Sequence, residues 1–368
     1  MDIAILTQDY ELQGFLSNPV AVIYTEGYCS LGNFQLNLPL DSTNTTLVQE
    51  ERIVLFDMDK GIAGIIGVVQ KTISSKGVPE LTVKGNLLEE FLFRRICWGL
   101  YTKSGFPSDI AYDMVEKHVT APTITARAIP DIVALDADKA VQLGVKTTLQ
   151  DTGGVVGDNL IALCSPDSLG FRLRLELPNK RMVFKVYKGT DRTINQTEVA
   201  PCLFSYIFEN MLESEYNLNT QDSRNVALVA GEGEGIERTY TTVGEASGKS
   251  RKEVFVDARD LQSTDDNGME MTAEEYLEVL KQRGSEKLAE CRRVESFDGT
   301  INTQGNIRYG VDYFLGDKVT VFDSQLGIQL DAIITEAEHS YSSKGESLNL
   351  TFGFGPLTLT QKLKVRMM

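Results

Sequence analysis

The stretch KVTVFDSQLGI, residues 318–328, repeats the pattern of RIVLFDMDKGI, residues 52–62. In both, an apolar, β-branched run ends in Phe-Asp, and Gly-Ile follows after a short polar segment. Apolar β-branched runs favour strands, and Asp and Gly within a few polar residues are typical of tight turns. The repeat therefore predicts two similar β-hairpins, one near each end of the chain.

The similarity continues after a shift of two residues. SSKGVPELTVKG, residues 74–85, parallels SSKGESLNLTFG, residues 342–353. Both copies then have the same order of strand, tight turn, strand, Ser-Ser-Lys-Gly turn and strand. An internal repeat of this kind indicates that one supersecondary unit is used twice.

This repeat predicts a mostly β fold with α+β insertions, in which two similar small β-barrel domains flank a mixed α/β middle region. The helical part of that middle region is either a domain of its own or an insertion into one of the β-domains. The expected divisions are a first β-barrel domain at 1–88, a middle region at 89–293, a second β-barrel domain at 294–357 and a C-terminal tail at 358–368.

Three segments have the periodicity and end signals of helices: 86–99, 107–120 and 272–293. Asn86 is placed to cap the first helix, and Thr272 with Glu275 has the spacing of a capping box. Gly284 falls inside the third helix, where glycine costs about 1 kcal/mol relative to alanine. We expect a kink or a close approach at that position.

Composition limits the kinds of partner. The net charge of −16 argues against a protein that grips DNA or an anionic membrane, because such proteins need clustered Lys and Arg. An acidic wall past which DNA slides remains compatible with this charge. We find no apolar run long enough to span a membrane and no N-terminal signal pattern. Five scattered cysteines fit reduced, mostly buried thiols in a protein made in a cytoplasm.

No residue pattern predicts a catalytic, cofactor-binding or metal site. The loop in VALVAGEGEGIERTY, residues 226–240, precedes a strand and carries three glutamates, so it favours an acidic hairpin tip over a phosphate site. His118 and His339 are the only histidines, and neither has partners at metal or catalytic spacing. Trp98 is interpreted as a packing anchor.

Several motifs, taken in order, resemble the tail-hub (baseplate-hub) proteins of siphophages, to which hubs of contractile tails and phage-tail-like bacteriocins are related. The motifs run from about Val20 to Gly353, and none of them falls in 120–165. They are VIYTEGYCSLGNFQLNLPL, LTVKGNLLEEFLFRRICWG, RNVALVAGEGEGIERTY, KEVFVDARDL and YGVDYFLGDKVTVFDSQLGIQLDAIITEAEHSYSSKGESLNLTFG.

The resemblance implies a non-enzymatic structural protein at the tail tip or baseplate of a virion, assembled in the host bacterial cytoplasm. Three copies would form a ring whose six β-domains match the sixfold tail tube and distal tail protein. The ring would hold a central spike or tail-tip protein and enclose the channel through which tape-measure protein and DNA leave. No sequence-specific nucleic-acid binding and no membrane insertion are expected.

Two other functions remain open at this stage. One is a peptidoglycan hydrolase of the tail tip, although such chains usually append a Cys/His or zinc domain, and only about fifteen residues follow the second β module. The other is a receptor-binding tail protein, although aromatic residues are only 8% of the chain and are spread along it.

Overall fold

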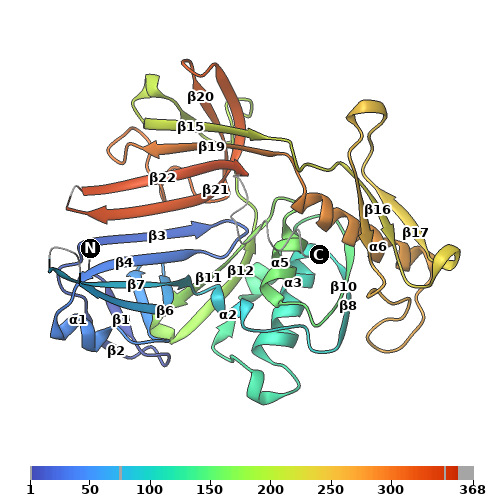
Figure 1. Ribbon diagram of the computed structural model, residues 1–368, viewed down its shortest axis with the longest axis horizontal. Helices are drawn as coiled ribbons and strands as arrows, with labels where there is room; N and C mark the ends of the chain where they lie inside the picture. Colours follow the sequence, from blue (N-terminus) through green and yellow to red (C-terminus); the bar gives the residue numbers. More distant parts are fainter. Residues whose placement is uncertain (1, 74–76, 344, 355–368) are drawn as a thin grey trace.

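The computed structural model describes residues 2–73, 77–343 and 345–354, and in these residues strands predominate over helices (Figure 1). The mostly β class predicted from the sequence is confirmed. Within this part of the chain, 14 strands join into one large sheet. Its main path runs β15-β19-β22-β21-β3-β4-β7-β6-β5-β1-β2, with β20 attached to β21 and with β13 and β14 attached to β20.

The strands of the large sheet come from both ends of the chain. Their bounds are β1 Ala4–Leu6, β2 Leu12–Phe15, β3 Ala21–Gly27, β4 Asn33–Pro39, β5 Ile53–Asp57, β6 Ile62–Ile73, β7 Pro79–Leu87, β13 Asp191–Arg192, β14 Leu203–Phe204, β15 Met211–Asn219, β19 Val294–Ile301, β20 Lys318–Asp323, β21 Ile328–Ser342 and β22 Gly345–Phe354. We call β1 to β7, with helix α1 (Ser42–Leu47), the N-terminal unit, and β13 to β15 with β19 to β22 the C-terminal unit.

The two units share one strand order. Along the sheet, β3-β4-β7-β6-β5 in the N-terminal unit corresponds to β15-β19-β22-β21-β20 in the C-terminal unit. In each unit three consecutive strands form the antiparallel meander that the sequence repeat predicts. These strands are β5, β6 and β7 in the N-terminal unit and β20, β21 and β22 in the C-terminal unit. Residues 74–76 and 344, which belong to the predicted Ser-Ser-Lys-Gly turns of the two copies, lie outside the described residues.

The turns of the two predicted hairpins are built alike. Asp57 Oδ1 accepts a hydrogen bond from the Lys60 N–H at 2.9 Å, and Asp323 Oδ1 accepts from the Leu326 N–H at 3.0 Å. Gly61 and Gly327 then have φ of +65° and +66°, a left-handed conformation that glycine adopts without strain. The repeated Asp and Gly therefore specify the turn, while the apolar runs specify the strands.

Each unit also has an irregularity at the same place in its longest strand. The pairing of β6 with β7 shifts between Ile66 and Val68, and the pairing of β21 with β22 shifts between Ile334 and Glu336. Such β-bulges bend a strand and increase its twist. The bulges at Gly67 and Thr335 thus give both sheets a bend at equivalent points.

The sequence predicted closed barrels. Strand pairing among the described residues does not form them, because the path of the sheet stays open from β15 to β2. The length of β21 explains this. Its first part pairs with β20, and the part beyond its bulge pairs with β3 of the other unit. The edge that could close the C-terminal unit instead joins the two units into one sheet, with a separate hydrophobic core under each half.

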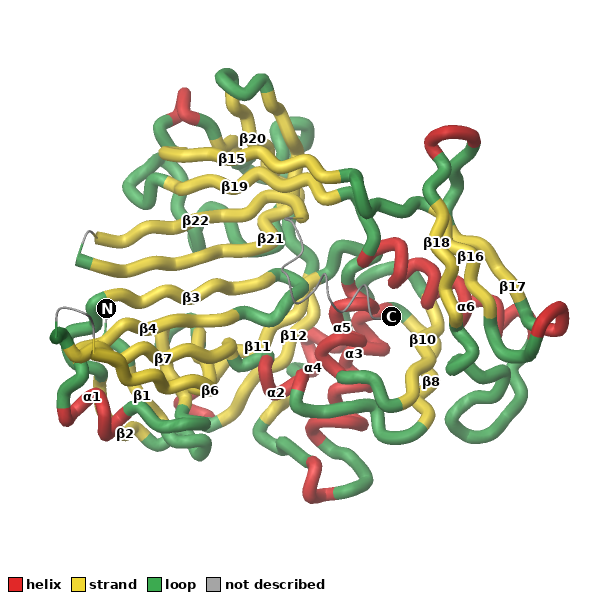
Figure 2. Tube along the Cα trace, viewed as in Figure 1, coloured by secondary structure: helices red, strands yellow, loops and turns green. Residues whose placement is uncertain are grey.

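A mixed region lies beside the N-terminal unit and shares a third core with β5 and β6 (Figure 2). It contains strands β8 and β10, strands β9, β11 and β12, and helices α2 to α5. Their bounds are α2 Glu90–Phe93, β8 Leu100–Gly105, α3 Pro107–Val115, β9 Ile132–Val133, α4 Asp136–Lys139, β10 Thr147–Thr152, α5 Val156–Cys164, β11 Gly170–Glu176 and β12 Arg181–Tyr187. Short 3-10 turns lie at Thr125–Arg127, Leu177–Asn179 and Tyr206–Phe208.

Two of the helix predictions made for this part of the chain have different outcomes. The helix at 107–120 is confirmed as α3, continued by a π-helical turn at Glu116–Thr120. The helix at 86–99 is wrong in extent, since α2 is a single turn at Glu90–Phe93. Asn86 is not its cap, because Asn86 is paired with Asn33 and Ile65 within the sheet.

Residues 220–293 form a separate body between β15 and β19, at the right of Figure 1. It comprises β16 Val226–Ala230, β17 Tyr240–Val243, β18 Glu253–Asp257 and helix α6 Ala273–Glu290, with 3-10 turns at Gly235–Glu237 and Gly248–Ser250. These elements share their own core. The capping box of Thr272 and Glu275 is present, as predicted. A Cβ on Gly284 would lie 2.7 Å from Val243 Cγ2, so the close approach is confirmed.

Candidate functional site

One face of the large sheet points away from the hydrophobic cores. Side chains alternate along each strand, so that on β21 Ala337 and His339 are buried while Glu336 and Glu338 lie on the opposite side. We call this uncovered side the polar face. Its polar side chains are Glu213, Glu215 and Asn217 on β15, Asp298 and Thr300 on β19, Asn349 and Thr351 on β22, Glu336, Glu338 and Ser340 on β21, Thr25 on β3, Asn33, Gln35 and Asn37 on β4, Glu80, Thr82 and Lys84 on β7, and Gln70 and Thr72 on β6.

Carboxylates concentrate where the polar face crosses the C-terminal unit. One row of directly paired residues runs Glu215, Asp298, Thr351 and Glu336 across four strands. The Thr351 hydroxyl donates to Asp298 Oδ1 at 2.6 Å. This places three carboxylates in a single row that is bridged by a neutral side chain.

The next row repeats this arrangement. Asn349 Nδ2 donates to Glu338 Oε1 at 3.0 Å, while Asn349 Oδ1 accepts from the Thr300 hydroxyl at 2.8 Å. Glu213 lies opposite Thr300 at the edge of the sheet. In the part of the chain that the structure describes, no Lys or Arg forms an ion pair with any of the five carboxylates on these two rows.

The two rows flank a groove of about 390 Å³, lined mainly by Asp298, Glu336, Glu338, Asn349 and Thr351. Loss of hydration there, together with the negative charges of Asp298 and Glu338, raises the pKa of Glu336. Uncompensated carboxylates repel phosphate groups, so this surface does not suit nucleic-acid binding. Among the described residues, no three His, Cys, Asp or Glu side chains are grouped so as to hold a metal ion.

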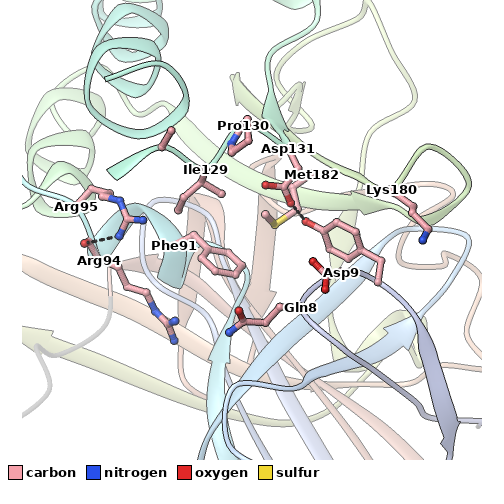
Figure 3. A pocket seen from close by; sticks show the side chains of 12 residues that line it. Gln8, Asp9, Phe91, Arg94, Arg95, Ile129, Pro130, Asp131, Lys180 and Met182 are labelled. Atoms are coloured by element: carbon pink, nitrogen blue, oxygen red, sulfur yellow. Dashed lines mark hydrogen bonds between the residues drawn. The ribbon is translucent and has the colours of Figure 1, made fainter. Parts of the chain in front are cut away.

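A second hollow, of about 680 Å³, lies between the N-terminal unit and the mixed region (Figure 3). Gln8, Asp9 and Tyr10 come from the β1–β2 connection, and α2 with the segment after it contributes Arg94 and Arg95. The remaining wall is formed by Phe91, Ala128, Ile129, Pro130, Asp131, Lys180 and Met182. The hollow therefore combines both signs of charge with a few apolar side chains.

Most polar groups of this hollow are paired, either with each other or with Glu51 and Arg127 beside it. The Tyr10 hydroxyl donates to Asp131, and burial together with that carboxylate raises the pKa of Tyr10. Arg95 donates to the carbonyl oxygens of Arg127 at 2.7 Å and Arg94 at 3.0 Å, and Arg94 donates to Glu51 (Figure 3 draws the Arg95–Arg94 bond). A tyrosine with a raised pKa stays protonated at neutral pH and gives up its proton poorly, so this arrangement favours a structural role.

The two histidines occupy separate, buried positions. The ring of His339 stacks on Tyr24 with centroids 4.6 Å apart, and its Nε2 lies 3.4 Å from Glu26 Oε1. His118 accepts from the Trp98 N–H at 3.4 Å. Burial, followed by the charges of Arg127 and Lys117, lowers the pKa of His118. Neither geometry places a histidine in an open cleft.

Trp98 differs from the expectation of a buried anchor. Its side chain is 61% exposed, and the Arg127 guanidinium lies 4.9 Å from the ring centroid. Trp98 precedes β8 and lies beyond the short α2, so it has no helix end to pack against. The expected anchor role therefore fails for the same reason as the long helix.

A buried ion cluster connects the two units with the mixed region. Arg174 on β11 pairs with Glu26 on β3, and its Nη1 lies 3.8 Å from Glu89 Oε1. The Tyr309 hydroxyl donates to Glu26 Oε1 at 3.3 Å. Although burial acts in the opposite direction, the charges of Arg174 and His339 lower the pKa of Glu26 to about 2. The cluster therefore fixes both units against β11.

The chain also matches a known protein family over nearly its whole described length. A family model described as Siphovirus ReqiPepy6 Gp37-like protein matches residues 2–354. The chain belongs to this family. Membership confirms the resemblance to siphophage tail proteins found in the sequence. A direct comparison with curated proteins gives no match to the Gp37-like chain.

Several solved structures have a fold similar to that of the Gp37-like chain. A tail protein from Neisseria meningitidis MC58 is 13% identical, with 95% of each chain covered and a TM-score of 0.58. The 43 kDa tail protein of prophage MuSo2 from Shewanella oneidensis is 10% identical, with 96% of this chain and 98% of that chain covered and a TM-score of 0.57. Prophage tail protein gp18 from Listeria monocytogenes EGD-e is 11% identical over 100% of both chains, with a TM-score of 0.54.

The acidic character of the polar face was not predicted residue by residue. The signal was nevertheless present in ITEAEHSYS, residues 334–342, where Glu336 and Glu338 alternate with buried side chains. Reading this segment with a period of two would have placed both carboxylates on one face. The partners on β15 and β19 could not be found in this way, because they depend on strand pairing over more than 30 residues.

Proposed function

We propose that this Gp37-like chain is a structural, non-enzymatic tail hub, three copies of which form a ring at the distal end of a phage or phage-like tail. The observation that carries the proposal is the use of one strand order twice within one sheet. Two equivalent units per chain make six in a threefold ring. Such a ring matches a sixfold tail tube on one side and a threefold tip on the other.

The polar face supports an orientation for the ring. We propose that this face lines the exit channel, with the hydrophobic cores behind it. The five carboxylates from Glu213 to Glu338 carry no basic partner in the described residues, so the wall would repel the phosphates of passing DNA. This agrees with the net charge of −16.

The domain division remains part of the proposal. The first hub domain comprises 1–88, and the second comprises 294–357 together with β15, since β15 pairs with β19. The rest of the middle region predicted at 89–293 then supplies the mixed body and the insert that decorate the ring. Residues 358–368, proposed as a tail, lie outside the described part of the chain.

The proposed partners follow from the position at the tip. They are the distal tail protein and tail tube on the sixfold side, a central spike or tail-tip protein on the threefold side, and the tape-measure protein in the channel. In the described residues no helix has the length and apolar character needed to cross a bilayer.

Immunogold labelling of purified particles with an antibody to this chain tests the location. Label at the distal tip of every tail is the expected result, and a native mass of three chains for the released complex tests the ring. Finished particles without label would overturn the proposal. Degradation of cell walls by the purified chain would instead favour a hydrolase, and loss of adsorption with normal assembly on gene deletion would favour a receptor-binding protein.

A further inference from the structure

Two unpaired strand edges of the large sheet, one at the end of its path in β15 and one along the distal part of β6, expose apolar side chains. Among the strands that the structure describes, β15 pairs with β19 alone, and Leu212 and Leu218 on it are 56% and 50% exposed. Beyond the bulge at Gly67, β6 pairs with β7 on one side, and no described strand pairs with its other side. Val69 and Ile73 there are 37% and 76% exposed. Unpaired edges of this kind are templates for pairing with another chain.

The protein already contains one junction between equivalent strands. β3 of the N-terminal unit pairs antiparallel with the part of β21 that follows its bulge. In the strand correspondence, β3 is equivalent to β15, and β21 is equivalent to β6. The two free edges are therefore the counterparts of the two strands that join the units within one chain.

We propose that β15 of one copy pairs antiparallel with Val68–Ile73 of β6 in the next copy, so that the sheet continues around the ring. This inference rests on the proposed hub function, because it names the contact between copies that the ring requires. It is a head-to-tail contact, and head-to-tail contacts generate closed rings when the rotation between copies closes.

The register of this contact follows from the two bulges. Gln70 and Glu338 are both third after their bulge residues, Gly67 and Thr335. From Gln70, direct pairing leads through Thr82 and Asn37 to Ala21, and from Glu338 it leads through Asn349 and Thr300 to Glu213.

Ala21 on β3 is thus equivalent to Glu213 on β15, and Thr25 is equivalent to Asn217. Within the chain, Thr25 lies opposite Glu338. Between copies, Asn217 should therefore lie opposite Gln70. The same register sets Leu218 opposite Val69, which covers two exposed apolar side chains with each other, and leaves both amides on the polar face.

Charge favours this pairing over contact between two β15 edges. β15 carries Glu213 and Glu215 and no basic residue, so two β15 strands would set carboxylates against carboxylates. The distal part of β6 carries no acidic residue, and its one charged residue, Lys71, projects from the face opposite to the two glutamates. A second copy presenting β6 is therefore the better occupant of the β15 edge.

Disulfide cross-linking of the full chain tests the register. In the Asn217→Cys/Gln70→Cys variant, mild oxidation should give a covalent trimer as the largest species, because directly opposite Cβ atoms come within disulfide range. The matched control is Asn217→Cys/Lys71→Cys, whose thiols would project from opposite faces. We expect about tenfold less cross-linked product from it. Background should be low, since burial raises the pKa of all five native thiols.

A second pair, Glu215→Cys/Thr72→Cys, lies one alternation along the same strands and should cross-link to the same extent, which guards against one variant failing to fold. A native trimer in which neither pair cross-links above the control would overturn the edge pairing and leave the ring standing. A native monomer or dimer would overturn the ring and this contact together. A covalent dimer from Asn217→Cys alone would show that two β15 edges meet, and would also overturn the inference.

Discussion

The N-terminal and C-terminal units have the same strand order but different charge on the polar face. Glu336 and Glu338 on β21 stand where Val68 and Gln70 stand on β6. Three further carboxylates of the C-terminal unit, Glu213, Glu215 and Asp298, stand where the N-terminal unit has Ala21, Ile23 and Gln35. The residues facing the cores, by contrast, are mainly apolar in both units.

This difference shows which residues the fold requires. Alternation buries every second side chain, and the buried set, the Asp-Gly turns and the bulges are shared by the two units. The outward set is under no such constraint. In the proposed ring, the channel wall would therefore alternate between three acidic and three nearly neutral sectors, although its strands follow a sixfold pattern.

The largest expected effect comes from breaking the ion cluster that holds the two units. Arg174→Met leaves Glu26 and Glu89 buried without their cation, and we expect a loss of about 3–5 kcal/mol in the free energy of unfolding, measured by denaturant titration. The control is Arg172→Met on the same strand, where the guanidinium lies 4.9 Å from the Tyr187 ring and about 1 kcal/mol or less is expected. Equal losses in both variants would contradict the role of the cluster.

The same cluster has a pH signature. The pKa of Glu26 is about 2 in the folded protein, below the ordinary value of 4.5. Its contribution to stability is therefore complete above about pH 4.5 and is lost as the pH falls toward 2. Unfolding curves of the native chain and of Arg174→Met should converge over that interval.

The two hairpin turns offer a more direct comparison. A Cβ on Gly61 would lie 2.3 Å from the Leu175 carbonyl oxygen, while a Cβ on Gly327 has no atom within 4 Å. Gly327→Ala should cost about 1–2 kcal/mol, the cost of a left-handed alanine. Gly61→Ala should cost about 3 kcal/mol or more, because β11 must also move. Thermal unfolding of both variants measures the difference. Equal losses of stability would contradict the prediction, because they would mean that β11 can move away from residue 61 at no cost.

The insert provides a prediction outside the repeated units. Glu286 on α6 is buried, and loss of hydration raises its pKa to about 7, even though Arg283 opposes the shift. An acid with a raised pKa destabilises the fold as the pH rises from 4.5 through 7. Glu286→Gln should therefore add about 1–3 kcal/mol to the free energy of unfolding at pH 8 and little at pH 4.

Two measurements would contradict this view of Glu286. One is an equal effect of Glu286→Gln at pH 4 and pH 8 in denaturant titrations. The other is an equal gain at pH 8 for the control Glu290→Gln, which changes an exposed residue at the end of the same helix.

The smallest effect is expected on the polar face. Glu336→Gln removes one of three neighbouring negative charges and should stabilise the protein by about 0.3–1 kcal/mol at pH 8, with no gain below pH 4.5. Glu80 lies on the same face of the N-terminal unit between Pro39 and Thr72, so Glu80→Gln should have no measurable effect. A similar gain in stability from Glu336→Gln and from Glu80→Gln would contradict the proposed electrostatic difference between the two units.

The sequence predicted the local parts of this fold and not the long-range pairings. The Asp57–Gly61 and Asp323–Gly327 segments specify hairpins by themselves, and Thr272 specifies the start of α6. The prediction of a long helix at 86–99 failed because Asn86 pairs with strands distant in sequence. No local sequence pattern could show that Asn86 would pair with β4 and β6 and so not begin a helix.

The candidate site was predictable only in part. Net charge indicated an acidic surface, but β15, in which Glu213 and Glu215 alternate with Leu212, Ser214 and Tyr216, was not recognised as a strand. Its partner β19 begins 75 residues later, after the insert, so the pairing of Glu215 with Asp298 is invisible locally. Likewise, the junction of β3 with β21 connects residues about 300 positions apart.

The position of the insert has a consequence for how such proteins diversify. Its two ends are adjacent, since Asn219 and Val294 are paired across β15 and β19. The register of the sheet is therefore independent of how many residues lie between them. A lineage can lengthen, shorten or exchange this body and keep the same sheet, so the outer shape of the protein can change while its repeated framework is inherited intact.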